Sequence, residues 1–294
     1  MHSNFMASVR ARSEHAIASG DLQPIQAEQV VIEDQGLRFI IRWIAGLAAK
    51  DAAGKQAVSL PGGPRDPGFN PFLNPDPALR VGPVGEHHTA ILNKFPVSLH
   101  HLVLARRTFA EQCSPLDAID FQALAFVLSA QGGLGFYNGG AAAGASQRHK
   151  HVQWIPSSPD NASLASLAAG LPEGVAADTV VRHPALDLAH GFVRVDAGQG
   201  ADVQASARSM LSAFERACAV LGLSPGADGL LPACNMLVGD GWLLVVPRSQ
   251  EHFQGVSLNA LSFGGTIYVR DPAQIDAIRA AGPLQVLASV GLPG

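Results

Sequence analysis

The chain has 294 residues, of which 47% are hydrophobic and 15% charged, and this composition excludes intrinsic disorder over most of its length. Its 24 acidic and 20 basic residues give a net charge of −4, so no overall basic field favours nucleic acid or an anionic membrane as a partner. The apolar stretches are too short for a transmembrane helix, and the first 20 residues lack the apolar segment of a signal peptide, so neither is expected.

The first predicted strand covers residues 36–44, where apolar side chains alternate with arginines. Residues 50–83 are rich in glycine, proline, asparagine and aspartate. Such a composition is typical of a loop, because proline lacks an amide donor and glycine permits turns. A loop of this length is expected either to be mobile or to fold over a site. Two further strands are predicted at residues 89–92 and 101–105.

A helix is predicted from Ser114 to about residue 130. Ser114 is expected to be its N-cap, because proline follows at the first helical position and an aspartate lies in the first turn. The helix should stop at the Gly132-Gly133 pair. Residues 203–221 have the best amphipathic pattern of the chain and predict a second helix.

The remaining predicted elements are extended segments at 135–138, 149–155, 233–238 and 242–247, followed by a last helix beginning at Asp271-Pro272. Because strands and helices occur in mixed order, we expect an α+β fold with a largely antiparallel sheet flanked by helices. We divide it into an N-terminal catalytic part, residues 1–180, and a C-terminal part, residues 181–294, that completes the site.

Most of the chemical information lies in one segment, Asn138-Gly-Gly-Ala-Ala-Ala-Gly-Ala-Ser-Gln-Arg-His-Lys-His-Val-Gln-Trp. Because alternate side chains of a strand share a face, His149, His151 and Gln153 are expected to project together, while Lys150 faces the other way. Three polar, nitrogen-bearing side chains in a row suit a site better than a core.

The loop before these residues consists of small residues together with Ser146 and Gln147. Backbone N–H groups in such a loop can approach a ligand closely, which suits a polyphosphate. A neutral imidazole is a capable nucleophile at neutral pH, and its attack on phosphorus would give a covalent phosphoramidate.

A metal site is the main competing interpretation of the two histidines. It would need a third and a fourth ligand, and the spacing of nearby His, Cys and Asp residues supplies none convincingly. Adjacent pairs such as His87-His88 and His100-His101 point to opposite faces of a strand, so each pair is expected to have one buried and one exposed member. Nucleotidyl transfer is therefore favoured, and no metal ligand is predicted.

The cysteines indicate the compartment. Cys113, Cys218 and Cys234 are odd in number and far apart, so neither a disulfide framework nor a thiolate zinc site is expected. A reducing cytoplasm fits this pattern better.

Several separate motifs, in the right order, make the chain resemble the diadenosine tetraphosphate phosphorylases, or ATP adenylyltransferases, of the histidine-triad superfamily. The motifs are Asn70-Pro71-Phe72-Leu73, Leu92-Asn93-Lys94-Phe95, Phe136-Tyr137-Asn138-Gly139-Gly140, Gly144-Ala145-Ser146-Gln147, His149-Lys150-His151-Val152-Gln153, Asn235-Met236-Leu237 and Val246-Pro247-Arg248-Ser249-Gln250-Glu251. The resemblance runs through most of the chain and implies a histidine-triad-like fold.

The resemblance also implies roles for single residues. His151 matches the family nucleophile that becomes adenylylated, and His149 would orient or polarise the phosphates. Gln153 stands where the histidine-triad hydrolases carry a third histidine. Positions that match nucleotide- and phosphate-binding residues of the family are Asn93, Lys94, Asn138, Gly144, Ala145, Ser146 and Gln147, with Asn235 and Arg248 in the C-terminal motif and an upstream lysine that corresponds to Lys50 or Lys55.

The implied reaction is the conversion of diadenosine tetraphosphate and phosphate to ATP and ADP. Glutamine cannot act as a general base toward water, whereas phosphate is already anionic, so phosphorolysis is favoured over hydrolysis. A divalent cation such as magnesium is expected to accompany the polyphosphate. Two alternatives stay open: a related transferase that acts on a nucleoside diphosphate sugar, and a nucleotide sensor without turnover. The oligomeric state is not predicted.

Overall fold

The computed structural model describes residues 2–23, 28–43 and 70–294. Its largest sheet has eight strands: β3 (Arg80–Val84), β4 (His88–Leu92), β5 (Leu102–Arg106), β6 (Leu134–Gly139), β7 (His151–Ile155), β8 (Gly191–Arg194), β9 (Cys234–Gly239) and β10 (Trp242–Pro247). They lie in the order β3-β4-β5-β7-β6-β9-β10-β8, and every neighbouring pair is antiparallel. The predicted α+β fold with a largely antiparallel sheet is confirmed.

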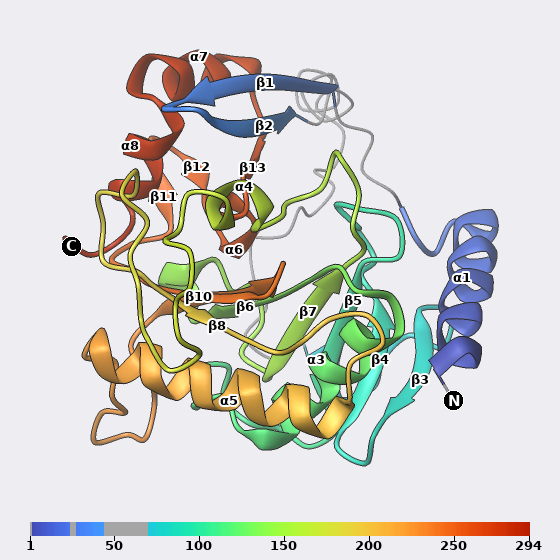
Figure 1. Cartoon of the computed structure of the whole chain (residues 1–294). Helices are drawn as coiled ribbons and strands as arrows, with labels where there is room; N and C mark the ends of the chain where they lie inside the picture. Colours follow the sequence, from blue (N-terminus) through green and yellow to red (C-terminus); the bar gives the residue numbers. More distant parts are fainter. Residues whose placement is uncertain (1, 24–27, 44–69) are drawn as a thin grey trace.

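Two long helices, α3 (Ala118–Gln131) and α5 (Val203–Val220), cover one face of this sheet (Figure 1). Phe121 of α3 and Phe214 of α5 pack ring against ring in a core that also contains Trp154 of β7. Helix α1 (His2–Ser19) packs against α3 and β3 at the edge.

The opposite face carries a second layer (Figure 1). It is built around a three-stranded sheet of β1 (Glu28–Asp34), β2 (Leu37–Trp43) and β13 (Thr266–Val269), in which β2 and β13 are parallel. The layer also contains α4 (Ala165–Ala168), α6 (Ala260–Phe263), α7 (Pro272–Ala281), α8 (Pro283–Ala288) and the short strands β11 (His252–Phe253) and β12 (Val256–Ser257). The two faces of the large sheet therefore bury two separate hydrophobic clusters.

The helix-start prediction at Ser114 is wrong by three residues. Asp117 is the N-cap of α3, and its carboxylate accepts hydrogen bonds from the backbone of Ile119 and Asp120. The Asp120 carboxylate in turn accepts from the Asp117 backbone N–H, which completes a capping box. Two charged acceptors satisfy the first helical amides better than a single hydroxyl at Ser114.

Other predicted boundaries also need correction. β3 begins at Arg80, inside the stretch 50–83 predicted as a loop, and β7 begins at His151, with His149 in an isolated bridge to Glu111. Asp271 caps α7 as predicted, but α8 follows it, so α7 is not the last helix. Strands β1 and β8 and helix α1 were not anticipated from the pattern.

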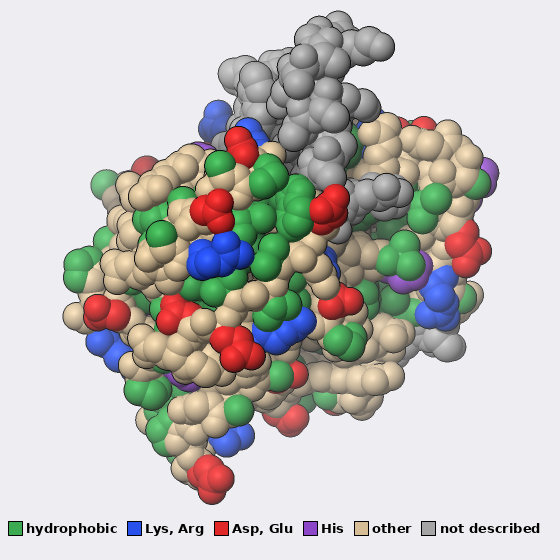
Figure 2. All heavy atoms as spheres, turned by 90° about the horizontal axis from the view of Figure 1, so that it is seen from above, with side chains coloured by type: hydrophobic (Ala, Val, Ile, Leu, Met, Phe, Trp, Pro, Cys, Tyr) green, Lys and Arg blue, Asp and Glu red, His purple; other side chains and the backbone are tan. Residues whose placement is uncertain are grey.

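Both predicted parts, residues 1–180 and 181–294, contribute to the eight-stranded sheet, because β6 pairs with β9. The division between them stays a prediction. No helix within the described ranges is long and apolar enough to span a membrane. Seen from above, the surface shows acidic and basic side chains interspersed (Figure 2).

Candidate active site

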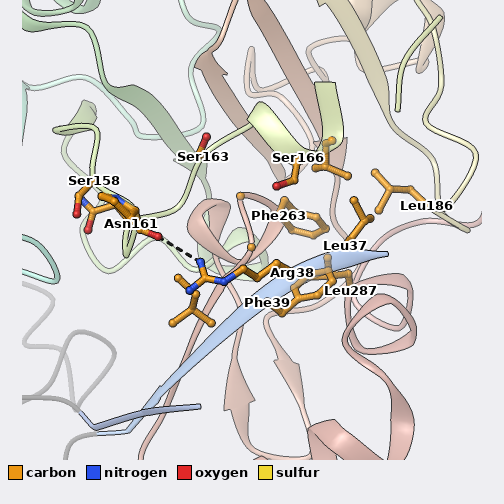
Figure 3. Close-up of a pocket in the computed structure, with 15 residues that line it drawn as sticks. Leu37, Arg38, Phe39, Ser158, Asn161, Ser163, Ser166, Leu186, Phe263 and Leu287 are labelled. Atoms are coloured by element: carbon orange, nitrogen blue, oxygen red, sulfur yellow. Dashed lines mark hydrogen bonds between the residues drawn. The ribbon is translucent and has the colours of Figure 1, made fainter. Parts of the chain in front are cut away.

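A cavity of about 220 Å³ lies between β2, α6 and the segment that follows β7 (Figure 3). Its walls are mainly apolar, and at its rim Arg38 donates a hydrogen bond to the Pro159 carbonyl, at 3.2 Å. None of the residues predicted for the site lines this cavity. The candidate site lies instead where β7 begins.

His151, the first residue of β7, is held in a single tautomer. Its Nδ1 lies 2.8 Å from the backbone oxygen of His149 and must donate to it, because a carbonyl only accepts. The lone pair of the ring is therefore on Nε2, which has no hydrogen bond to any residue that the structure describes. The side chain is 4% exposed, and burial lowers the pKa of His151 to about 4. At neutral pH His151 is a neutral imidazole with one unshared nitrogen.

His149 uses both of its ring nitrogens within the protein. Nε2 donates to the backbone oxygen of Arg106, at 2.7 Å, so Nδ1 is the acceptor for the Asn70 amide, at 3.0 Å. Phe72 packs beside both histidines, with its ring centroid 5.9 Å from that of His149 and 4.9 Å from that of His151. The predicted role of His149 toward the phosphates is not tested by these contacts.

Gln153 is oriented by a chain of hydrogen bonds from Asn93, which follows β4, and His101, which precedes β5. The Asn93 amide donates to Nδ1 of His101, at 3.3 Å, and Nε2 of His101 donates to Oε1 of Gln153, at 2.9 Å. Burial lowers the pKa of His101 to about 4, so this ring is also neutral. The amide nitrogen of Gln153 forms no hydrogen bond to a described residue and is left as a donor.

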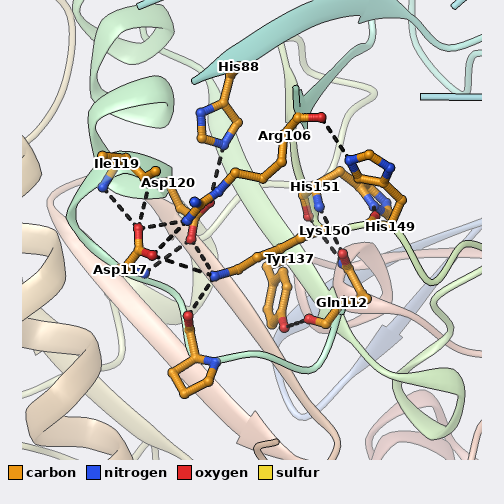
Figure 4. Close-up of polar contacts among 11 residues, drawn as sticks. His88, Arg106, Gln112, Asp117, Ile119, Asp120, Tyr137, His149, Lys150 and His151 are labelled. Carbon is orange, nitrogen blue, oxygen red and sulfur yellow. Dashed lines mark hydrogen bonds and ion pairs between the residues drawn. The ribbon is translucent and has the colours of Figure 1, made fainter. Parts of the chain in front are cut away.

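Lys150 lies on the opposite face of the strand, as the alternation predicts (Figure 4). Its ammonium lies 2.8 Å from the Asp120 carboxylate, which also binds Arg106, at 2.6 Å, and His88, at 3.1 Å. Burial alone would raise the pKa of Asp120, but the hydrogen bonds from His88 and Arg106 and the charge of Lys150 hold it well below its usual value. This buried network ties the residue between the two site histidines to helix α3.

The loop between β6 and β7 begins with the 3-10 turn η1 (Ala141–Ala143). Gly144 ends this turn with φ +83, and a Cβ there would lie 2.9 Å from Asn259, so only glycine fits. The backbone N–H groups of Ser146 and Gln147 form no hydrogen bonds to described residues. The loop thus offers two free amides close to the start of β7, whereas the N–H of Ala145 is used by Gly140.

Asn138, Asn235 and Arg248 form a buried chain that supports this loop. Oδ1 of Asn138 accepts from the Asn235 amide, at 2.9 Å, and that amide also donates to the Ala143 carbonyl, at 2.9 Å. Arg248 donates to Oδ1 of Asn235, and burial lowers its pKa to about 10. In this structure the side chains of Asn235 and Arg248 thus bind protein groups, and their contact with substrate stays a prediction.

Of the three lysines predicted to contact the substrate, only Lys94 is among the described residues. Lys94 is exposed beside Asn93, and its ammonium forms no ion pair with a described residue. Lys50 and Lys55 lie outside the described residues. Within the described ranges, no group of three or more His, Cys, Asp or Glu side chains lies close enough together to hold a metal ion. The magnesium ion stays a prediction.

Four residues of this region were not identified from sequence. Asn70 lies in a family-like motif, and His101 belongs to one of the adjacent pairs, of which it is the buried member with 3% exposure. Asp120 had a local signal, its capping-box spacing from Asp117. Gln112, which binds the backbone of His151, carries no signal in the sequence.

Comparison with known proteins identifies the family of the chain. The family model of the Ap4A phosphorylase N-terminal domain matches residues 1–167, and that of the ATP adenylyltransferase C-terminal domain matches residues 184–293. Diadenosine tetraphosphate phosphorylase 2 of Saccharomyces cerevisiae is 27% identical over 94% of this chain and 88% of its own length.

Solved structures of yeast Ap4A phosphorylase Apa2 share the fold. The complex with AMP superposes with a TM-score of 0.77 at 23% identity, covering 99% of this chain and 97% of that chain. The complex with Ap4A gives a TM-score of 0.76 at 23% identity, covering 99% and 98%.

Proposed function

Because the chain belongs to the Ap4A phosphorylase family, we propose that it converts diadenosine tetraphosphate (Ap4A) and phosphate to ATP and ADP through an adenylyl group on His151. The similar yeast protein is a phosphorylase of this dinucleotide, and the yeast structures contain AMP and Ap4A. The observation that carries the proposal is the fixed tautomer of His151, whose free Nε2 belongs to the first residue of β7, just after the glycine-containing loop in the chain.

In the first step, Nε2 of His151 attacks the α-phosphorus of one adenylyl group. The N–P bond forms as the bond to the bridging oxygen breaks, and ATP leaves as a stable anion that needs no proton. The ring keeps its proton on Nδ1 and becomes positively charged. The carbonyl oxygen of His149, 2.8 Å from Nδ1, stabilises that charge.

In the second step, an oxygen of inorganic phosphate attacks the same phosphorus from the side that ATP has left. The N–P bond breaks, ADP forms, and the neutral imidazole returns with its lone pair on Nε2. Phosphate arrives already ionised, so no base is required, and Gln153 cannot act as one toward water.

The loop amides and Lys94 are the groups that would stabilise the developing charge. The free amides of Ser146 and Gln147 are suitable donors for phosphate oxygens, because backbone dipoles in a fixed loop need no reorganisation as charge develops. Lys94, next to Asn93 in the chain, offers an exposed cation that forms no ion pair with a described residue, and a magnesium ion would enter bound to the polyphosphate. A cytoplasmic location remains the prediction made from the cysteines, all three of which are free thiols.

Product identification tests the proposal directly. Incubated with Ap4A, the enzyme should form equal amounts of ATP and ADP when phosphate is present, and His151→Ala should form neither. His15→Ala, which changes an exposed histidine of α1, is the matched control and should keep wild-type turnover. AMP as the main product, phosphate-independent turnover, preference for a nucleoside diphosphate sugar, or full activity of His151→Ala would contradict the proposal.

A further inference from the structure

The sheet opens between β6 and β7 at the position of the proposed nucleophile. The two strands pair only at Leu134↔Ile155, Gly135↔Trp154 and Phe136↔Gln153. Beyond that point β6 continues along β9, with Asn138 opposite Asn235, and no residue of β6 pairs with His151. The backbone N–H and C=O of His151 therefore face a gap where a ladder partner would normally lie.

The side chain of Gln112 fills this gap. Its Oε1 accepts the His151 N–H, at 2.8 Å, and its Nε2 donates to the carbonyl oxygens of His151, at 3.1 Å, and Asn138, at 2.9 Å. Gln112 is 3% exposed and uses its whole amide in these three bonds. Its side chain thus bridges two separated strands, and Figure 4 shows it beside His151.

The backbone of Gln112 is also held by hydrogen bonds, at both its N–H and its C=O. The Gln112 N–H donates to the Arg148 carbonyl, at 2.7 Å, and the Gln112 carbonyl accepts from the hydroxyl of Tyr137, which is 1% exposed. Lys150 donates its backbone N–H to Ala110, at 2.9 Å, so residues 110–112 run beside residues 148–150. These hydrogen bonds couple the position of Gln112 to that of the segment leading into β7.

We propose that Gln112 is a positioning residue for adenylyl transfer: its amide fixes the backbone of His151, and with it the direction of Nε2, while holding β6 and β7 apart where the loop between them begins. The inference rests on the proposed function, since it concerns how that nucleophile is aimed. Nucleophilic attack is sensitive to such aim, because a displacement of about 1 Å lowers a rate by about 100-fold.

Gln112→Met tests the loss of this bridge, because methionine fills a similar volume without hydrogen bonds. The matched control is Gln122→Met, which removes only a 3.4 Å hydrogen bond to Gln204 on the outer helices. The rate of ATP release in the first turnover without phosphate should fall by about 10- to 100-fold in Gln112→Met, with KM for Ap4A within about twofold of wild type. Rates are expressed per folded molecule, from circular dichroism.

Gln112→Glu supplies a readout that a purely structural role would not move. Above the pKa of the introduced carboxyl, the carboxylate accepts from the His151 N–H but repels the carbonyl oxygens of His151 and Asn138. Once protonated, it donates one of the lost hydrogen bonds. The ratio of the Gln112→Glu rate to the wild-type rate should therefore rise as the pH falls from 8 to 6.

Three titratable groups near Gln112 keep their charge over this range. Burial raises the pKa of Tyr137 and Cys113 and lowers the pKa of His151 to about 4, so these three stay neutral. Burial also lowers the pKa of His149, and dividing by the wild-type rate removes the effect of any group that titrates in both enzymes. Glu111 is paired with Arg148, at 2.5 Å. The change in the ratio would thus report the introduced carboxyl.

Wild-type first-turnover rates in Gln112→Met, an equal loss in Gln122→Met, or a pH-independent Gln112→Glu ratio would each overturn the inference. If Gln112→Met does not fold, the pH dependence of Gln112→Glu decides. A wild-type enzyme that releases no ATP from Ap4A would instead contradict the proposed function, so the two failures are distinguishable.

Discussion

His149 and His151 are each fixed by donating one ring N–H to a backbone carbonyl, His149 through Nε2 and His151 through Nδ1. The opposite choice of nitrogen leaves His149 with an acceptor that Asn70 fills and His151 with an acceptor on Nε2 that no described residue fills. Two residues with the same side chain thus have different chemical capacities, set by which nitrogen is occupied.

The protonation state of His151 gives a prediction at this scale. Burial lowers its pKa to about 4, so the nucleophile stays neutral well below the ordinary histidine pKa of about 6.5. The first-turnover rate of ATP release, measured at saturating Ap4A without phosphate, should therefore be nearly constant between pH 8 and 5.5. A rate that falls tenfold per pH unit below pH 6.5 would show that the ring is protonated in that range.

The sequence alone predicted which side chains of this site share a face of the strand. Strand alternation separated Lys150 from His151 and Gln153, because that pattern is local. The partners of His149 and Gln153 were not predictable, since Arg106 and His101 are 43 and 52 residues away in the chain and meet them only through strand pairing. Gln112 was missed for the same reason.

Among the elements, helix α3 supports the start of β7. Asp120 completes the capping box of α3 and also binds Lys150, which stands between the two site histidines. The prediction of Ser114 as N-cap failed because a serine followed by proline resembles a helix start locally, while Asp117 and Asp120 satisfy the first amides three residues later.

Asp120→Asn tests this support. Asp120 is 1% exposed, and the substitution removes the charge that compensates Lys150 and Arg106, so the free energy of unfolding should fall by about 3–5 kcal/mol. Urea denaturation at pH 7.5 measures it. Asp276→Asn, at an exposed ion pair with Arg279 on α7, is the control and should change stability little. Equal free energies of unfolding for the two variants would show that the buried Asp120 network does not stabilise the contact between α3 and the start of β7.

The molecule as a whole is one eight-stranded sheet with a different layer on each face (Figure 1). The mixed order of predicted elements was enough to indicate an α+β fold, because local patterns fixed most strands. The parallel pairing of β2 with β13 was not predictable, since it joins residues near 40 to residues near 267 and has no local signal.

Buried neutral histidines make stability depend on pH. Burial lowers the pKa of six of them: His100, His101, His149, His151, His183 and His190. In the unfolded chain these rings take up protons near pH 6.5, whereas folded His101 and His151 do so near pH 4. Between these values the unfolded state binds more protons, so stability is complete above pH 6.5 and is lost as the pH falls toward 4.

The free energy of unfolding from urea titrations should therefore decrease between pH 6.5 and 4.5, by up to about 1.4 kcal/mol per pH unit for each such histidine. The double variant His101→Gln with His151→Gln should show a shallower decrease than wild type. A pH-independent stability across this interval, or an unchanged slope in the double variant, would contradict the assignment of neutral buried rings.

The account depends most on covalent attachment at one nitrogen of one ring. Wild-type enzyme is mixed with Ap4A without phosphate, denatured at neutral pH to preserve a phosphoramidate, digested and sequenced by tandem mass spectrometry. The account predicts one adenylyl group on His151, none on His149, and its loss as ADP when phosphate is added before denaturation. An unmodified His151 peptide during ATP release, or an adenylyl group on a different residue, would contradict it.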